Sequence, residues 1–472
     1  MTWIQSHSLE LLALLLYTAL MVYHAWVGNR QTRSLADYFV GGRSIGGATV
    51  GISFFATYAS TNSFVGFSGQ GYDFGLAWLL MVPFAVGFSF ISWVWIAPRL
   101  REQTESLGSL TIPDFIGFRF ASQPARIVAA LIVLLSSFIY TTAVFKGIGN
   151  LLEAFLDVSY WHAIFIVLVI VVAYTAVGGF HSVVQTDVVQ GVIMIIAAVL
   201  LFWGTTQAAG GLQSIYQVRE GVHGPRLFSW DAAMPLPMLL GVLFATTIKF
   251  VVEPRQLSRF YALSDPKQAR LGGLISTLAF LLVFSLLVPV GLYARNILPS
   301  ELPDTDHVVP ALLASGAVFG PIVSALLVLA MVSAAMSSLD SVLLVMASTC
   351  ERDLVGLWRG NRSEERAIGA TRVYVAAFAV LAAVIALDPP GSVVTITALS
   401  GSLYAACFLP AIVLGLYWKR GDGRAVLASF VAGILCLCCW QFVSLSETIH
   451  RVFPAVICSL VTYVAVARFW FR

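Results

Sequence analysis

Four polar residues stand together in the stretch AAMSSLDSVLL, residues 334–344, inside an otherwise apolar run: Ser337, Ser338, Asp340 and Ser341. In a helix, Ser337, Asp340 and Ser341 share one face, while Ser338 lies about 100° round from it. A single Ser often bonds back to a carbonyl four residues earlier, but this habit explains an added Asp poorly. Hydroxyl and carboxylate oxygens are the ligands that small hard cations prefer. The stretch therefore predicts a cation site inside a helix.

The composition places this helix in a membrane. Of the 472 residues, 59% are hydrophobic and 11% are charged, against about 25% charged in ordinary soluble domains. The apolar run around the polar stretch, 319–349, is long enough to cross a bilayer, which takes about 20 residues. We therefore expect an all-α polytopic membrane protein, with the lipid bilayer as its surroundings and no nucleic-acid partner.

About thirteen apolar segments are long enough to be transmembrane helices. They are numbered here as spans 1 to 13: 8–28, 46–66, 74–98, 126–149, 158–178, 184–207, 237–254, 271–294, 318–349, 371–387, 392–417, 424–444 and 453–471.

The placement of basic residues predicts the orientation of these spans. Most of the 27 Lys and Arg residues fall in alternate connections, and such connections face the cytoplasm. With thirteen spans, this bias puts the N-terminus outside and the C-terminus in the cytoplasm, and we expect the cell membrane as the location.

Other polar residues at membrane depth leave two interpretations open. Span 2 and its continuation, 51–72, are rich in Gly, Ser, Thr and Ala. This pattern fits close helix packing or a broken helix whose carbonyls bind a cation. Asp187, near the start of span 6, is favoured either by the helix dipole or as part of a site. Lys249 and Glu253 either pair at i, i+4, or Lys249 meets a substrate carboxylate. For Lys146, near the outer end of span 4, the expectation is that it reaches to the surface.

Several function classes are excluded by missing motifs. The chain carries no phosphate-binding loop of the Gly-x-x-x-x-Gly-Lys-Ser/Thr type, so nucleotide-driven pumping is not indicated. No nucleophile–base pair or metal-ligand cluster stands out among the 7 His. We expect no enzyme and no organic cofactor, and an ion gradient as the energy source.

Seven motifs between Ala36 and Arg424 carry a resemblance to a known family. They are GGRSIGG, GYDFGLAW, LTIPDFIGFRF, YTAVGGFHSVVQTDVVQ, PRQLSRFYALSDPKQAR, MSSLDSVLL and LPAIVLGLYWKR. Their order and their placement relative to the spans resemble the sodium/solute symporter family, whose members carry proline, pantothenate, monocarboxylates, sialic acid, sugars and iodide.

The resemblance implies a LeuT-like fold of two inverted five-helix repeats, spans 2–6 and 7–11, with three flanking helices. It divides the chain into an N-terminal extra helix with an inner loop (1–45), a transporter core (46–417, with repeats at about 46–207 and 237–417) and two C-terminal helices (418–472).

The resemblance also implies binding residues, position by position. The main sodium site maps to the carbonyls of Ala56, Ala59 and Ala334 and the hydroxyls of Ser337 and Ser338. A second cation or proton site, found in some members, maps to Asp187, Ser337, Asp340 and Ser341. Several members have a small or hydroxyl residue in place of Asp340. The substrate candidates lie in spans 2 and 7: Tyr58, Asn62, Ser63, Thr246, Lys249 and Phe250.

The resulting hypothesis is sodium-coupled symport of a small organic solute by alternating access. Lys249 favours a carboxylate, such as a monocarboxylate, pantothenate or a proline-like amino acid. One alternative is a proton-coupled carrier on the same fold that uses Asp187 and Asp340; another is a transporter-like membrane sensor. We expect a monomer to suffice for transport, and the sequence leaves the oligomeric state open.

Overall fold

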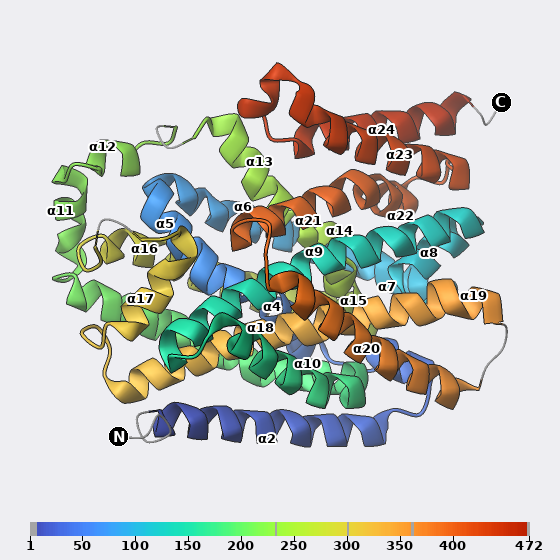
Figure 1. Ribbon diagram of the computed structural model, residues 1–472. Coiled ribbons are helices and arrows are strands. Elements are labelled where there is room, and N and C mark those ends of the chain that lie inside the picture. Colours follow the sequence, from blue (N-terminus) through green and yellow to red (C-terminus); the bar gives the residue numbers. More distant parts are fainter. Residues whose placement is uncertain (1–6, 232–233, 300–301, 360–362, 470–472) are drawn as a thin grey trace.

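A computed structural model describes residues 7–231, 234–299, 302–359 and 363–469. Within these ranges the chain is helical, without a β-strand. Most helices run roughly along one direction, with α2 at one edge of the bundle and α23 and α24 at the opposite edge (Figure 1). The longer helices are α2 (Ser8–Gln31), α4 (Gly47–Tyr58), α6 (Met81–Ile91), α7 (Ala97–Ser106), α9 (Gln123–Leu156), α10 (Tyr160–Ala208), α13 (Leu236–Thr247), α15 (Pro254–Ala262), α16 (Ala269–Ala294), α18 (Pro321–Thr349), α20 (Glu364–Ala386), α21 (Val393–Leu409), α23 (Gly423–Cys439) and α24 (Val452–Phe469).

Shorter helices connect or extend these elements. They are α3 (Leu35–Val40), η1 (Gly41–Arg43), η2 (Asn62–Phe67), α5 (Ser68–Phe74), η3 (Gly75–Leu80), η4 (Ser92–Ile96), α8 (Ile112–Arg119), η5 (Leu212–Ser214), α11 (Ile215–Glu220), α12 (Gly224–Leu227), α14 (Lys249–Val252), η6 (Pro266–Gln268), η7 (Thr305–His307), α17 (Val308–Ala314), η8 (Cys350–Val355), α19 (Gly356–Arg359), η9 (Pro410–Leu414), α22 (Gly415–Tyr417), η10 (Trp440–Phe442) and η11 (Ser444–Glu447).

Eleven helices in the described ranges are long and apolar enough to cross a membrane, against the thirteen predicted. Two features account for the difference. Spans 5 and 6 form one continuous element, α10, which is interrupted only by the left-handed backbone of Gly179 at φ 63° and ψ −169°. Span 2 is divided, so that α4 alone is too short to count and its continuation merges with span 3 into 62–106.

Span 2 shows both of the features that its small residues allow. The helix α4 ends at Tyr58, Ala59 and Ser60 follow outside any helix, and the chain resumes helical structure at Asn62, so the broken helix is confirmed. Close packing is also present, because a Cβ added to Gly51 would lie only 2.5 Å from the carbonyl oxygen of Gly272 in α16. Small residues thus bring the broken helix against its neighbour.

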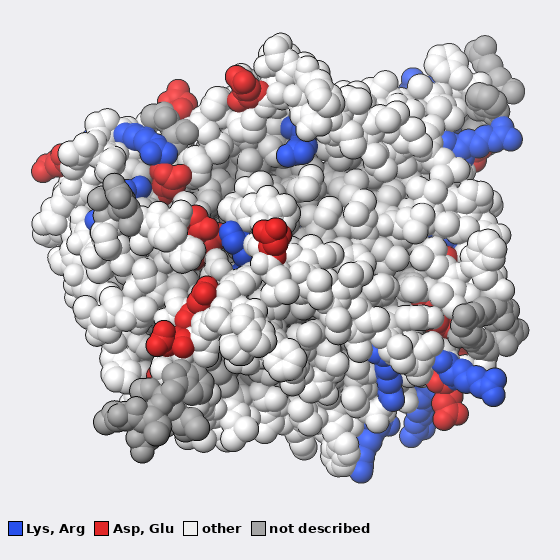
Figure 2. All heavy atoms as spheres, viewed as in Figure 1, with Lys and Arg blue, Asp and Glu red and all other residues white. Residues whose placement is uncertain are grey.

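The connections predicted to face the cytoplasm meet at one end of the molecule. Elements α7, α8 and α19 lie there, and α11, α12 and α17 lie at the opposite end (Figure 1). Most charged side chains visible on one face lie toward these two ends (Figure 2). Two of the basic residues that contribute to the predicted orientation, Arg362 and Arg472, lie outside the described residues.

Buried ion pairs tie these inner connections together. Arg126, at the start of α9, reaches Asp114 of α8 and Asp353 of η8, each at 2.8 Å. Arg352 adds a contact of 3.1 Å to Asp114. Both carboxylates are buried and each has a basic partner, so their desolvation is offset by pairing.

At the opposite end of the molecule, the expectation that Lys146 reaches to the surface is wrong. Its side chain is buried instead of reaching to the surface, and Nζ lies 2.9 Å from Asp306 and donates to the Gly391 carbonyl at 3.1 Å. Asp306 also accepts the backbone N–H of Val393, the first residue of α21. Next to this pair, a hydrogen bond from His307 lowers the pKa of Asp304 to about 2. Because the ammonium pairs with Asp306 inside the fold, the side chain does not extend to solvent.

Candidate cation and substrate sites

The predicted main sodium site is assembled where α4 ends against the middle of α18. The Ser337 hydroxyl lies 2.9 Å from the Ala56 carbonyl and 3.1 Å from that of Ala334. The Ser338 hydroxyl donates to the Thr57 carbonyl at 3.0 Å. Ala59 is the first residue after α4, and it is fully buried.

The end of a helix explains why these oxygens are available. The last four carbonyls of a helix lack partners within it, and here the α18 hydroxyls and Arg255 approach them; Arg255 donates to the Thr57 carbonyl at 2.8 Å. A cation between α4 and α18 can draw on the Ala56 carbonyl, which has a second lone pair besides the one that Ser337 uses, and on the two hydroxyl oxygens. The Thr57 carbonyl already accepts from both Ser338 and Arg255. All the residues involved are buried, so such a cation would be screened from water.

The residues of the predicted second site gather around a guanidinium that the sequence interpretation did not include. Asp187 accepts from Arg259 Nη2 at 2.8 Å, from Ser53 at 2.5 Å and from Thr57 at 3.2 Å. The same Arg259 nitrogen lies 2.6 Å from the Ser341 hydroxyl. A protein cation therefore occupies the place between Asp187 and Ser341. Asp187 is buried deep in the core with a basic partner, so its interpretation as an interfacial helix start is wrong.

Asp340 lies at the side of this arrangement. Its carboxylate contacts the Ser341 hydroxyl at 3.1 Å and the Tyr174 hydroxyl at 3.3 Å. No ion pair is recorded for it within the described ranges. The Ser341 hydroxyl also donates to the Ser337 carbonyl four residues earlier, so back-bonding within α18 coexists with the contacts to other helices. The two carboxylates are linked through Arg259 and Ser341, with no direct hydrogen bond recorded between them.

We expect Arg259→Gln to destabilise the fold strongly. The substitution leaves the Asp187 carboxylate buried without a cation, which costs about 3–5 kcal/mol. The apparent thermal unfolding midpoint of the purified protein should fall, and adding Asp187→Asn should recover much of the loss because the uncompensated charge is gone. Arg99→Gln, at an exposed position, is the matched control. A midpoint in Arg259→Gln equal to that of the control would contradict the pairing.

Lys249 is fully buried at the break of span 7 between α13 and α14. Its Nζ makes no hydrogen bond with the described residues, and the nearest carboxylate oxygen, that of Glu253, is 4.0 Å away. Glu253 is instead held at 2.9 Å by Arg255. Nζ stands 4.3 Å from the ring centre of Tyr140, which partly stabilises the cation. The predicted i, i+4 pair of Lys249 and Glu253 is therefore present at 4.0 Å, but Arg255 at 2.9 Å is the closer partner of the carboxylate.

The remaining substrate candidates lie on α4, η2, α13 and α14. The Tyr58 hydroxyl donates to the Thr246 carbonyl at 3.0 Å, and the Tyr58 ring lies 4.2 Å from that of Phe250. The side-chain oxygens of Asn62 and Ser63 are buried without a hydrogen-bond partner among the described residues. The Thr246 hydroxyl bonds back to carbonyls of its own helix. The Thr246 hydroxyl is therefore less available to a ligand than the side-chain oxygens of Asn62 and Ser63.

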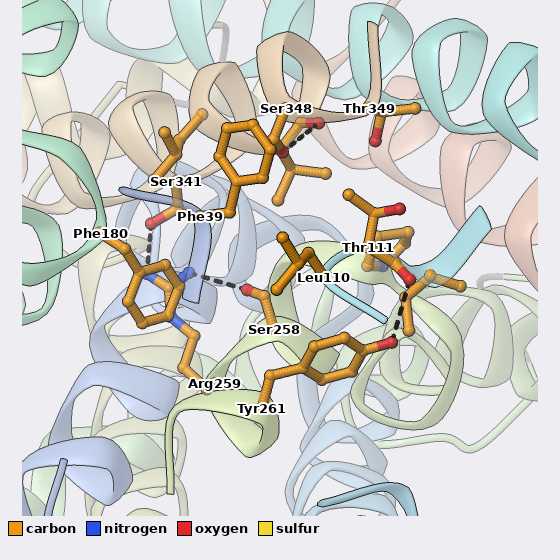
Figure 3. Close-up of a pocket in the computed structure, with 14 residues that line it drawn as sticks. Phe39, Leu110, Thr111, Phe180, Ser258, Arg259, Tyr261, Ser341, Ser348 and Thr349 are labelled. Atoms are coloured by element: carbon orange, nitrogen blue, oxygen red, sulfur yellow. Dashed lines mark hydrogen bonds between the residues drawn. The ribbon is translucent and has the colours of Figure 1, made fainter. Parts of the chain in front are cut away.

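A small cavity adjoins the guanidinium on the side of α8. Its volume is about 20 Å³, room for about one water molecule. Figure 3 shows Arg259 directed toward Ser341 and hydrogen-bonded to Ser258, with Tyr261 and Thr111 across the cavity. A polar, water-sized space therefore lies beside the Arg259 cluster.

Arg255 and Arg259 are the important residues that the sequence interpretation missed. Both lie between the predicted spans 237–254 and 271–294, where a connection is expected, yet α15 begins at Pro254 and all nine of its residues are buried. Proline fits the first turn of a helix as well as it ends one. The available signal was Asp187 itself, because a carboxylate at membrane depth requires a partner.

Comparison with known proteins identifies the family. The sodium:solute symporter family matches residues 38–433. The chain belongs to this family. It is therefore a transporter and not an enzyme.

Individual relatives and structures agree with this assignment. The chain is 27% identical to a sodium/pantothenate symporter of Haemophilus influenzae, covering 93% of this chain and 91% of the relative. It is 28% identical to an osmoregulated proline transporter of Bacillus subtilis, covering 97% and 94%. A Na⁺-coupled sialic acid symporter superimposes with a TM-score of 0.84 at 18% identity, covering 98% of each chain. The fold of this family member is therefore LeuT-like, as predicted.

Proposed function

We propose that this family member couples sodium entry to the uptake of a small organic carboxylate by alternating access. Membership of the family supports sodium as the coupling ion and a small organic solute as cargo. In this proposal sodium binds between Ala56, Ala59 and Ala334 and the hydroxyls of Ser337 and Ser338. We further propose that the chain lies in the cell membrane with its N-terminus outside and its C-terminus in the cytoplasm, as the distribution of Lys and Arg predicts.

The observation that carries the choice of a carboxylate is the state of Lys249. A fully buried ammonium without a hydrogen bond among the described residues is costly unless a partner arrives. A carboxylate supplies both opposite charge and acceptor oxygens, and charge-assisted hydrogen bonds are the stronger kind. The unpartnered oxygens of Asn62 and Ser63 suit polar groups elsewhere on the same solute. Proline and pantothenate, the solutes that appear in the names of the relatives, both carry a carboxylate.

The rival use of Asp187 and Asp340 for proton coupling gains less support. Asp187 is paired with Arg259 at 2.8 Å, so taking up a proton would give up this buried ion pair. A proton carrier has to take up and release its proton during transport. The same guanidinium also makes a second sodium ion between Asp187 and Ser341 unfavourable by charge repulsion. We therefore favour one sodium ion, at the Ser337 and Ser338 site.

A ligand screen tests the proposal and identifies the solute at the same time. The thermal unfolding midpoint of purified protein is measured with organic acids, amino acids and sugars, in sodium and in choline. Because sodium and solute binding are coupled reciprocally, a carboxylate should stabilise the protein more in sodium than in choline. Stabilisation by a neutral sugar alone, or by a carboxylate equally in both salts, would contradict the proposal.

A further inference from the structure

A deep groove opens on the side of the bundle between α6, η4 and the start of α16. Its volume is about 890 Å³. The walls carry Phe90, Val94, Leu274 and Leu278, which are 58%, 48%, 59% and 54% exposed. Such a contiguous apolar hollow in a membrane protein faces lipid tails.

Trp93 and two glycines of α16 form the floor of the groove. Trp93 is buried there, and its ring packs over Gly272 and Gly273 of α16. A Cβ added at Gly273 would lie 2.8 Å from Cβ of Trp93, and one at Gly272 would lie 2.5 Å from the indole ring. Glycine at both positions lets α16 and η4 approach while the larger side chains on either side form the walls.

One end of the groove is basic. Lys267 in η6 and Arg270 in the first turn of α16 line it and are exposed. Neither side chain forms an ion pair with the residues that the structure describes. The nearby Asp265 carboxylate accepts the backbone N–H of Lys267 at 2.7 Å, where it caps η6. Two cations without acidic partners therefore stand at the mouth of an apolar channel.

The spacing of these features matches an amphipathic molecule of the bilayer. Arg270 and Leu278 are eight positions apart on α16, about 12 Å along the axis, so the basic end and the apolar wall follow one another along the helix. Lys267 and Arg270 belong to a connection that the distribution of Lys and Arg assigns to the cytoplasmic side. Basic pockets between transmembrane helices on that side select anionic headgroups.

We propose that this groove is a binding site for an anionic phospholipid of the inner leaflet. The phosphate and headgroup lie against Lys267 and Arg270, and an acyl chain lies along Phe90, Val94, Leu274 and Leu278. The apolar walls accept any acyl chain, whereas the two cations prefer an anionic lipid, by about fivefold for each basic residue. The site is separate from the Ser337 and Lys249 regions, so this proposal stands independently of the transported solute.

Lipid retention on the full-length protein tests the proposal. Native mass spectrometry compares phosphatidylglycerol with phosphatidylcholine carrying the same acyl chains. The unmodified protein should retain phosphatidylglycerol at least about tenfold better. In Lys267→Gln/Arg270→Gln this preference should fall to near equality. In the control Lys419→Gln/Arg420→Gln, at exposed basic positions of another inner connection, it should persist.

A second measurement places the lipid directly. Phosphatidylglycerol with a photoreactive acyl chain should cross-link to peptides that contain 88–98 and 266–278, and the double variant at Lys267 and Arg270 should lose these cross-links. Equal retention of the two lipids by the unmodified protein would overturn the proposal. So would an equal loss of preference in the control variant, or cross-links spread evenly over the other lipid-facing helices.

Discussion

Replacing Ser337 and Ser338 together by Ala should raise the sodium concentration that gives half-maximal uptake by at least about tenfold, because one contact to a charged group contributes about 1.5–3 kcal/mol. The double variant removes both hydroxyl ligands and leaves the carbonyls of Ala56 and Ala334 in place. The solute concentration for half-maximal uptake at saturating sodium should change much less. The measurement is initial uptake into proteoliposomes over a range of sodium concentrations.

The matched control for this variant lies one turn earlier in the same helix. Ser333 is fully buried, and its hydroxyl has no hydrogen-bond partner among the described residues. Ser333→Ala therefore removes the same atom from α18 without touching the α4 carbonyls. An unchanged sodium dependence in the double variant, or an equal shift in Ser333→Ala, would remove Ser337 and Ser338 from the site.

Lys249→Met should abolish the preference for a carboxylate over its amide. The charge-assisted hydrogen bond is worth about 1.5–3 kcal/mol, which corresponds to a preference of roughly 10-fold to 150-fold in half-maximal concentration. Met keeps a long side chain beside Tyr140, so the packing around position 249 should change little. The measurement is competition of the carboxylate and its amide for uptake of the labelled solute.

Thr247→Val controls for general disturbance of span 7. The Thr247 hydroxyl is buried and bonds to the Leu243 carbonyl of its own helix, and Val has nearly the same volume. The carboxylate preference should persist in this variant. If Lys249→Met retains the preference, Lys249 has a structural role beside Glu253 and Tyr140, and the solute meets a different group.

Part of the cation site could be predicted because each of its two halves lies in a short stretch of sequence, 56–59 and 334–338. The spacing of SSLDS on one helix fixes which hydroxyls share a face, and the run of small residues in span 2 indicates the broken helix that meets them. The pairing of the two stretches was implied by the family resemblance, and the structure brings Ser337 to Ala56 and Ser338 to Thr57, a residue that the resemblance did not indicate.

The charged residues that escaped prediction lie in no local pattern that indicates their partners. Arg259 meets Asp187 across 72 positions, and Lys146 meets Asp306 across 160. Composition and charge counting assign an Arg near a span end to a connection, since the rule registers where a charge occurs and not what it faces. A buried helix that starts at Pro254 has the same local signature as a loop. Only the tertiary arrangement distinguishes the two.

The most direct test of the account measures solute and sodium uptake together in proteoliposomes. The solute is the carboxylate found in the ligand screen, with an inward gradient of either sodium or choline chloride. We predict accumulation of the solute with sodium only, accompanied by labelled sodium entry in fixed proportion. Equal uptake in choline, or accumulation driven by a pH gradient at zero sodium, would contradict sodium coupling.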